Sequence, residues 1–239
     1  MQSLALPKTY NIYNKMVNTQ AYLSLSEQLK IQNTTLVAVS KLKSAADIQA
    51  LYALGQRDFG ENYVQELMEK EAELPKDIRW HFIGHLQSNK VKYIAPFVHL
   101  IHGVDSLKLL LEINKQGKKL GRVIDCLLQV HIATEDTKFG FDNTELFQFG
   151  AYYEANKTEL SHVRIRGMMG MASFSEDESQ VRKEFNALKQ TFEVHKGSTF
   201  LFEQSFDTLS MGMSGDYELA IAEGSNMVRI GSLLFGRRN

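Results

Sequence analysis

Two hydrophobic periodicities alternate along the chain. Short runs that are almost wholly apolar are followed by longer segments in which apolar residues recur at every third or fourth position. The first pattern is typical of strands that are buried on both faces, and the second of amphipathic helices. The strands are expected at 35–40, 57–60, 79–84, 98–102, 123–132, 163–168, 208–211 and 227–230, and the helices at 9–31, 44–54, 62–73, 106–121, 144–157, 176–195 and 216–222.

This alternation predicts an α/β protein of one domain. Eight parallel strands that alternate with helices and are joined by right-handed crossovers close into a (β/α)8 TIM barrel, and 239 residues suit one such barrel. No Pro-rich or Gly-rich linker interrupts the pattern. We therefore expect a single domain over residues 1–239, with an added N-terminal helix at about 9–31 before a barrel at about 35–239.

Charge and composition exclude several classes of protein. The formal net charge of −1 gives no electrostatic footprint for nucleic acid or an anionic membrane. No apolar run approaches the length of a membrane span, and residues 1–8 lack the charged and apolar regions of a signal peptide. The single cysteine, Cys126, lies in an apolar run and is expected to be a buried core thiol rather than a nucleophile. These features indicate a cytoplasmic protein.

The first candidate for chemistry is Lys41, which follows the apolar run of the first strand. Reacting groups of parallel α/β proteins collect at the carboxyl ends of the strands. A lysine that is partly desolvated there loses some preference for its charged form and can act as an amine nucleophile. Lys43 would share its face if the chain stays extended, and the two ammonium groups would disfavour each other's charge. The alternative is that both are solvated loop lysines.

Two turns that contain glycine and serine follow the last two strands. They are residues 211–215, which include Ser214, and the pair Gly231 and Ser232. In a (β/α)8 barrel the loops after strands seven and eight commonly bind phosphate through backbone N–H groups, hydroxyl groups and a helix N-terminus. Either sequence alone could be only a turn, so the phosphate site rests on finding both of them together.

Arg229 lies inside an apolar strand, where a guanidinium needs a partner. It either pairs with a carboxylate or projects into the barrel mouth as a fixed hydrogen-bond donor. A strand-end amine and a phosphate site at the same mouth together point to pyridoxal 5′-phosphate (PLP), held by Lys41 as a Schiff base. Arg229 would then face the pyridine nitrogen and keep it unprotonated, which makes the ring a weaker electron sink.

Five segments of the chain resemble the pyridoxal phosphate homeostasis protein family, which is related to the N-terminal barrel of alanine racemase. The resemblance runs from about Leu36 to Arg237, and the segment 80–90 is its most specific part. The segments that carry it are 38–43, 59–66, 80–90, 209–214 and 228–236.

The resemblance implies a PLP-binding barrel of the alanine racemase N-terminal type that buffers or supplies the cofactor, without an established catalytic reaction. It also implies a monomer, with apo-enzymes that use PLP as candidate recipients. The phosphate and the pyridine nitrogen are expected at the two turns and at Arg229, respectively. The residues expected at the cofactor are Lys41 as the Schiff-base lysine, Asn62, Met211, Ser214, Arg229, Gly231 and Ser232.

The sequence departs from the family pattern at two positions. His131 stands where asparagine is expected, which changes the polar lining of the site. Leu42 replaces the usual threonine between the two lysines and is expected to point away from the ligand. Asn62 has an alternative interpretation too, because an asparagine at this position could cap the following helix.

Other candidate residues are assigned structural or supporting roles. His81 and His85 are four residues apart, but a strand-like segment separates them, so metal binding is not favoured. Lys90 and Lys138 are expected to be solvated, although either could offer an alternative amine. The methionine-rich run 168–171 is expected to pack against the cofactor ring rather than to bind a metal.

A second class of function remains open, that of a PLP-dependent racemase or decarboxylase. An enzyme of the alanine racemase type needs a second base on the opposite face of the ring, which a tyrosine of a separate C-terminal domain supplies. This sequence ends at Asn239, soon after the last strand, and shows no such domain. We therefore expect a carrier rather than an enzyme.

Overall fold

Eight parallel strands close into a barrel in the order in which they occur along the chain. The computed structural model describes residues 17–133 and 139–236. The strands are β1 (Thr35–Val39), β2 (Asp58–Glu61), β3 (Arg79–Phe82), β4 (Leu100–Val104), β5 (Ile124–Gln129), β6 (Val163–Met169), β7 (Thr208–Ser210) and β8 (Met227–Ile230). The last strand pairs with the first, where Arg229 lies opposite Val37. The prediction of a (β/α)8 barrel is confirmed.

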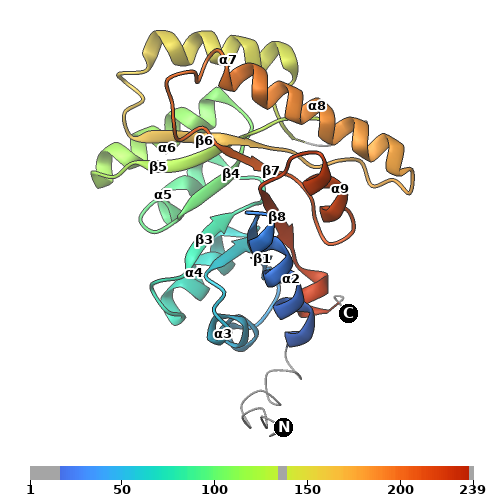
Figure 1. Cartoon of the computed structure of the whole chain (residues 1–239). Coiled ribbons are helices and arrows are strands. Elements are labelled where there is room, and N and C mark those ends of the chain that lie inside the picture. The colour runs from blue at the N-terminus through green and yellow to red at the C-terminus, as the bar shows by residue number, and fades with distance from the viewer. Residues whose placement is uncertain (1–16, 134–138, 237–239) are drawn as a thin grey trace, which may run out of the picture.

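Helices cover the outside of the barrel (Figure 1). The predicted helices are present with small shifts at their ends, except that the start expected near residue 9 lies outside the described residues. Three short helical elements, a 3-10 turn and a one-turn α-helix before β4 and a one-turn α-helix after β8, are additional, because a single turn is too short to show a periodicity. The helical elements are α2 (Thr19–Ile31), α3 (Ala45–Ala53), α4 (Val64–Glu73), the 3-10 turn η1 (Ser88–Lys90), α5 (Val91–Ile94), α6 (Leu107–Leu120), α7 (Asn143–Asn156), α8 (Glu178–Lys196), α9 (Tyr217–Ala222) and α10 (Ser232–Phe235).

Local capping signals fix the helix ends that shape the loops. Ser44 accepts a hydrogen bond from the backbone N–H of Asp47, while Asp47 accepts one from the backbone of Ser44. This capping box starts α3 soon after β1, so the loop that carries Lys41 is short. At the far end of α6, Gly121 has a φ of +61°, which is the left-handed conformation that ends a helix.

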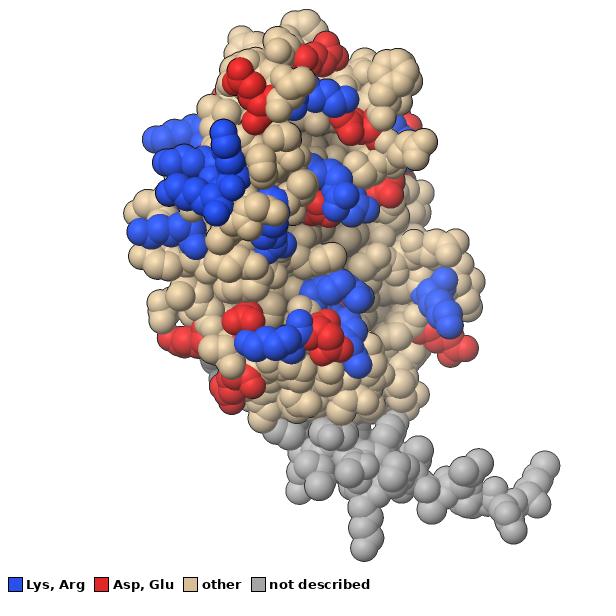
Figure 2. Space-filling model, turned by 90° about the vertical axis from the view of Figure 1, so that its left-hand side faces the viewer, with Lys and Arg blue, Asp and Glu red and all other residues tan. Residues whose placement is uncertain are grey.

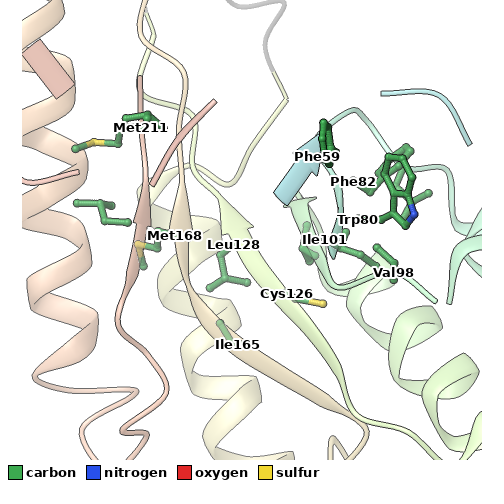
Figure 3. Packing of buried hydrophobic residues seen from close by; sticks show 14 of the residues in the cluster. Phe59, Trp80, Phe82, Val98, Ile101, Cys126, Leu128, Ile165, Met168 and Met211 are labelled. Atoms are coloured by element: carbon green, nitrogen blue, oxygen red, sulfur yellow. The ribbon is translucent and has the colours of Figure 1, made fainter. Parts of the chain in front are cut away.

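The main hydrophobic core lies between the barrel and its helices. Figure 3 shows two parts of this core, with Phe59, Trp80 and Phe82 packed together in one and Met168 in the other. Cys126 belongs to the same layer and is a buried free thiol, as predicted. Burial raises the pKa of this thiol above its usual value, so it is a poor nucleophile.

The interior of the barrel has a thin apolar layer with polar groups at both ends. Side chains alternate along a strand, so every second residue points inward. The apolar layer is a separate cluster from the main core and consists of Val37, Leu100, Leu127, Met169 and Met227. The polar residues above this layer belong to the C-terminal ends of the strands, which we call the mouth, and those below it to the N-terminal ends.

The two described ends of the chain lie beside each other. The backbone N–H of Asn18, before α2, donates to the carbonyl of Leu234 in α10 at 2.7 Å. Figure 1 shows these two helices, in blue and red, side by side against β1 and β8. The contact holds α10 next to the start of the barrel, close to the strand that precedes Lys41.

The molecular surface carries both signs of charge. On the side shown in Figure 2, Lys and Arg gather in one group and elsewhere alternate with Asp and Glu. This mixture agrees with the formal net charge of −1. Among the helices that the structure describes, none has the length and apolar character needed to cross a membrane.

Candidate functional site

Lys41 lies on a turn at the mouth, directly after β1, and is half-buried. The strand ends at Val39, and Leu42 has a φ of +62°, so the chain turns instead of staying extended. The expectation that Lys43 shares a face with Lys41 is therefore wrong. The amine of Lys43 instead donates to the carbonyl of Phe235 at 2.9 Å, at the C-terminus of α10.

Residues of α4 and β2 anchor the peptide groups on both sides of Lys41. The amine of Lys70 donates to the carbonyl of Ser40 at 2.8 Å. On the other side, the backbone N–H of Leu42 donates to a carboxylate oxygen of Glu66 at 2.6 Å. The hydroxyl of Ser40 also donates to Glu61 at 2.6 Å. The backbone of the lysine is thus tied to a rigid helix on the outside of the barrel.

These anchors form a buried ion network. The amine of Lys70 lies 2.8 Å from Glu61 and 2.6 Å from Glu66, and the side chains of Lys70 and Glu61 are 7% and 0% exposed. Burial raises the pKa of Glu61, against the opposing effect of Lys70. Only the pairing of Glu66 with Lys70, four residues apart on a helix, could have been found from the sequence. The contact between Lys70 and Glu61 joins a helix to a strand, so it could be found only from the structure.

Arg229 is buried inside the barrel near the C-terminal end of β8. Its Nη1 donates to the carbonyl of Ser210 at 2.9 Å and to the hydroxyl at 2.6 Å. Its Nη2 donates to the carbonyl of Gly170 at 3.1 Å. The sequence left open whether Arg229 pairs with a carboxylate or projects into the mouth as a donor. Among the described residues, no carboxylate is bonded to it. Burial lowers the pKa of Arg229 to about 10, which leaves it charged at neutral pH.

The two turns expected to bind phosphate lie together. The backbone N–H of Gly231 donates to the hydroxyl of Ser214 at 3.2 Å, which joins the loop after β8 to the loop after β7. A Cβ atom at Gly231 would lie only 3.1 Å from the carbonyl oxygen of Val39, so this loop also packs against the end of β1. Ser232 is exposed and begins α10. The loops thus lie beside the strand that leads to Lys41.

Asn62 does not cap a helix. Tyr63 is the N-cap residue of α4, and no side-chain hydrogen bond caps that helix. The side-chain Oδ1 of Asn62 is buried and has no hydrogen-bond partner among the described residues. The backbone of Asn62 is fixed by close packing against Gly84. A Cβ atom at Gly84 would lie only 2.5 Å from the carbonyl oxygen of Asn62. An unpaired buried acceptor on a fixed backbone agrees with a ligand-facing position.

The side chain of Met211 does not line the mouth. Ser210 points inward to Arg229, so the next residue points outward, and Met211 packs fully buried in the main core. Figure 3 shows it in the same part of the core as Met168. The methionine-rich run is likewise divided. Met169 faces the barrel interior and Met171 packs against that inner cluster, whereas Met168 faces the helices.

The remaining candidates are scattered. His81 is buried in the barrel, whereas His85 is on the surface, bonded to Asp105 at 3.0 Å, so the two do not share a site. Lys90 is exposed on η1, and Lys138 lies outside the described residues. His131 lies beyond β5, where its backbone N–H donates to the carbonyl of Phe141.

The arrangement suits an anionic ligand that carries a carbonyl group. A half-buried amine, a fixed guanidinium and a loop pair rich in hydroxyl and amide donors lie at the ends of β1, β7 and β8. Glycine in these loops permits close approach of the backbone to an anion, as at Gly212, which has a φ of +90°. These donors fit the phosphate, ring nitrogen and aldehyde of PLP.

Comparison with known proteins gives the same picture. The family of the alanine racemase N-terminal domain matches residues 20–239. The pyridoxal phosphate homeostasis protein of Helicobacter pylori is 40% identical over 202 residues, which cover 84% of this chain and 86% of that protein. The protein of the same name from Escherichia coli K12 is 37% identical over 212 residues, with 87% of each chain covered.

Solved structures extend the likeness to three dimensions. PipY of Synechococcus elongatus, with PLP bound, is 36% identical and superposes with a TM-score of 0.80 over 91% of this chain and 99% of its own. Alanine racemase of Bartonella henselae, with covalently bound pyridoxal phosphate, is 20% identical, with a TM-score of 0.64 over 89% of this chain and 57% of its own. The second likeness is one of fold alone.

Proposed function

The chain belongs to the pyridoxal phosphate homeostasis protein family, and from that premise we propose that it binds PLP at the mouth of its barrel through Lys41. The observation that carries this proposal is the contact between the two phosphate loops and the end of β1. Gly231 packs against Val39 and donates to Ser214, so a phosphate held there lies near the turn that carries the amine. The relative named PipY has PLP bound in its structure.

Each expected residue has a defined task in this proposal. The amine of Lys41 would hold the cofactor covalently, because the aldehyde of PLP can condense with an amine and lose water. Ser214, Ser232 and the backbone of Gly231 bind the phosphate, and Arg229 donates to the pyridine nitrogen. The unpaired oxygen of Asn62 provides a further polar contact, whereas Met211 contributes packing only.

We also propose that the protein is a carrier and not an enzyme. Its relatives bear the name of homeostasis proteins, which describes supply or buffering of the cofactor. PLP itself supplies an electron sink for carbanion chemistry, so a racemase or decarboxylase is the runner-up function. Apo-enzymes are the proposed recipients. A single cytoplasmic domain that works as a monomer completes the proposal.

Two assays test the carrier against the enzyme. First, the PLP-loaded protein is mixed with an apo-enzyme while a trap removes free cofactor, and recovered activity reports direct transfer. Second, deuterium incorporation at the α-carbon of alanine and other amino acids is measured in heavy water. A carrier should show no exchange above that of free PLP. Exchange that is many-fold faster and depends on Lys41 would establish the enzyme instead.

A further inference from the structure

A chain of hydrogen bonds crosses the barrel interior from Arg229 to Asp58. Nη1 of Arg229 lies 2.6 Å from Oγ of Ser210, which lies 3.3 Å from Nδ1 of His102. Nε2 of His102 lies 2.9 Å from Nδ1 of His81, whose Nε2 lies 3.0 Å from Oδ1 of Asp58. All five residues are buried. This interior relay joins the mouth to the N-terminal end of the barrel.

The two ends of the interior relay fix the direction of its hydrogen bonds. A guanidinium can only donate, and an ionised carboxylate can only accept. Burial by itself would raise the pKa of Asp58, but hydrogen bonds from Arg79 and His81 outweigh burial and hold that pKa well below its usual range. Asp58 is therefore ionised, and the hydrogen bonds run from Arg229 as the first donor to Asp58 as the last acceptor.

This direction determines the tautomer of both histidines. Burial lowers the pKa of His102, and the neighbouring charge of Arg229 lowers it further, so its ring is neutral and carries one N–H. Because ionised Asp58 can only accept, Nε2 of His81 donates to it, and with one N–H on each ring Nδ1 of His81 accepts from Nε2 of His102. Nδ1 of His102 is then an acceptor for the hydroxyl of Ser210, which itself accepts from Arg229.

We propose that Ser210, His102 and His81 are positioning residues that hold Arg229 as a fixed donor and transmit its state to the opposite end of the barrel. The part that concerns the cofactor rests on the proposed function. Hydrogen bonds in a chain polarise one another, especially where water is excluded. A new acceptor at Arg229, such as a pyridine nitrogen, therefore alters each bond down to that between His81 and Asp58.

The far end of the interior relay opens into a cavity of about 420 Å³, at the N-terminal end of the barrel. Arg79 is half-exposed there and binds Asp58 through Nε at 2.7 Å and through Nη2. Ligand atoms of Asp58, His81 and His99 lie within 4.8 Å of one another, as in a metal site. Arg79 already binds both oxygens of Asp58, which leaves this carboxylate poorly available to a metal ion. We therefore interpret Asp58 as the last acceptor of the interior relay rather than as a metal ligand.

The test is a measurement of histidine tautomers by NMR on the full-length, cofactor-free protein labelled with ¹⁵N-histidine. We expect both His81 and His102 to carry hydrogen on Nε2, with Nδ1 of His102 shifted as a hydrogen-bond acceptor. Ser210→Ala removes its donor, so this Nδ1 signal should move to the position of an unbonded nitrogen. Ser225→Ala is the matched control, because Ser225 is equally buried beside β7 and β8 but bonds only to backbone groups.

Addition of PLP then tests the link to the cofactor. Binding should shift the ¹⁵N signals of His102 and His81 in the unmutated protein. Ser210→Ala should weaken PLP binding about fivefold, the effect of one hydrogen bond, and should alter the cofactor absorption band, whereas Ser225→Ala should change neither. Hydrogen on Nδ1 of His102 in the cofactor-free protein, or equal effects of the two variants, would overturn the proposal. If PLP does not bind at all, the proposed function fails, while the tautomers still decide whether the relay exists.

Discussion

The two cations at the mouth of the barrel are held in opposite ways. Lys41 lies on a turn and is half-buried, and the peptide groups beside it are anchored from outside the barrel by Lys70 and Glu66. Arg229 lies on a strand inside the barrel, and its own guanidinium makes three hydrogen bonds. An amine that binds and releases an aldehyde needs a fixed backbone and a side chain that can move. A hydrogen-bond donor that affects the electronic state of a ring needs its donating group itself to be fixed. Under the proposed function, Lys41 would exchange the cofactor and Arg229 would set the charge environment of its ring.

The largest effect should come from loss of the exchanging amine. Lys41→Ala should abolish the absorption band of the covalently held cofactor, because the amine of the neighbouring Lys43 is already bonded to the carbonyl of Phe235. Lys43→Ala is the matched control, since its amine bonds to the carbonyl of Phe235. Absorption spectra of both variants after addition of PLP measure the effect. A full band in Lys41→Ala would remove Lys41 from the centre of the site.

The anchor of that amine is tested by Lys70→Met. This change leaves Glu61 buried without its cation, which we expect to lower the free energy of unfolding by about 3–5 kcal/mol. The control is Lys76→Met, because Lys76 pairs with Glu71 at an exposed site, where an ion pair contributes less than about 1 kcal/mol. Chemical denaturation of both variants makes the comparison. Equal losses would show that the buried network does not stabilise the turn.

Lys70→Met also tests how the free energy of unfolding depends on pH. Burial raises the pKa of Glu61 in the folded protein, so the folded state holds this proton more tightly than the unfolded state. The free energy of unfolding then falls as pH rises through that pKa, and stability from this group is greatest in acid. Without Lys70 the fall should be larger. Denaturation of both proteins at about pH 5 and about pH 8 measures the difference, and parallel changes would contradict it.

The fixed cation is tested by Arg229→Gln. A charged hydrogen-bond donor is lost at the ring, so we expect PLP to bind roughly 30-fold more weakly and its absorption band to shift. Arg122→Gln is the control, because Arg122 also donates to two backbone carbonyls but lies outside the barrel. Spectroscopic titration with PLP gives both quantities. Unchanged affinity with an unchanged band would place Arg229 away from the cofactor.

The smallest effect concerns the turn itself. Leu42 has a φ of +62°, a conformation that costs a non-glycine residue about 1 kcal/mol or more. Leu42→Gly should therefore raise the free energy of unfolding by up to about 1 kcal/mol. Asn33→Gly is the control, because Asn33 has a φ of 51° but asparagine tolerates this conformation. A loss of stability in Leu42→Gly would mean that its packing outweighs the strain.

The fold could be predicted from the sequence because its signals are local. Apolar runs gave most of the strands, and caps such as Ser44 gave helix starts. The one-turn helices α5 and α10 show no periodicity and were beyond this kind of prediction. Lys43 was misplaced for a related reason, since a left-handed turn at a leucine has no sequence signal.

The candidate site could be predicted only in part. Lys41 and Arg229 stand out because charged residues adjoin apolar runs. The outward direction of the Met211 side chain could also have been predicted, because alternation along β7 places Ser210 and Met211 on opposite sides. The anchor of Glu61 by Lys70 joins two separate elements, so it depends on distances that no single segment encodes.

The central claim, that Lys41 is the amine that holds PLP, has one direct test. The unmutated protein is loaded with PLP, reduced with borohydride and digested, and the modified peptide is identified by mass spectrometry. We expect a single major adduct on Lys41, because its turn lies beside the joined phosphate loops of Ser214 and Gly231. A major adduct on Lys43, Lys90 or Lys138 would contradict the account.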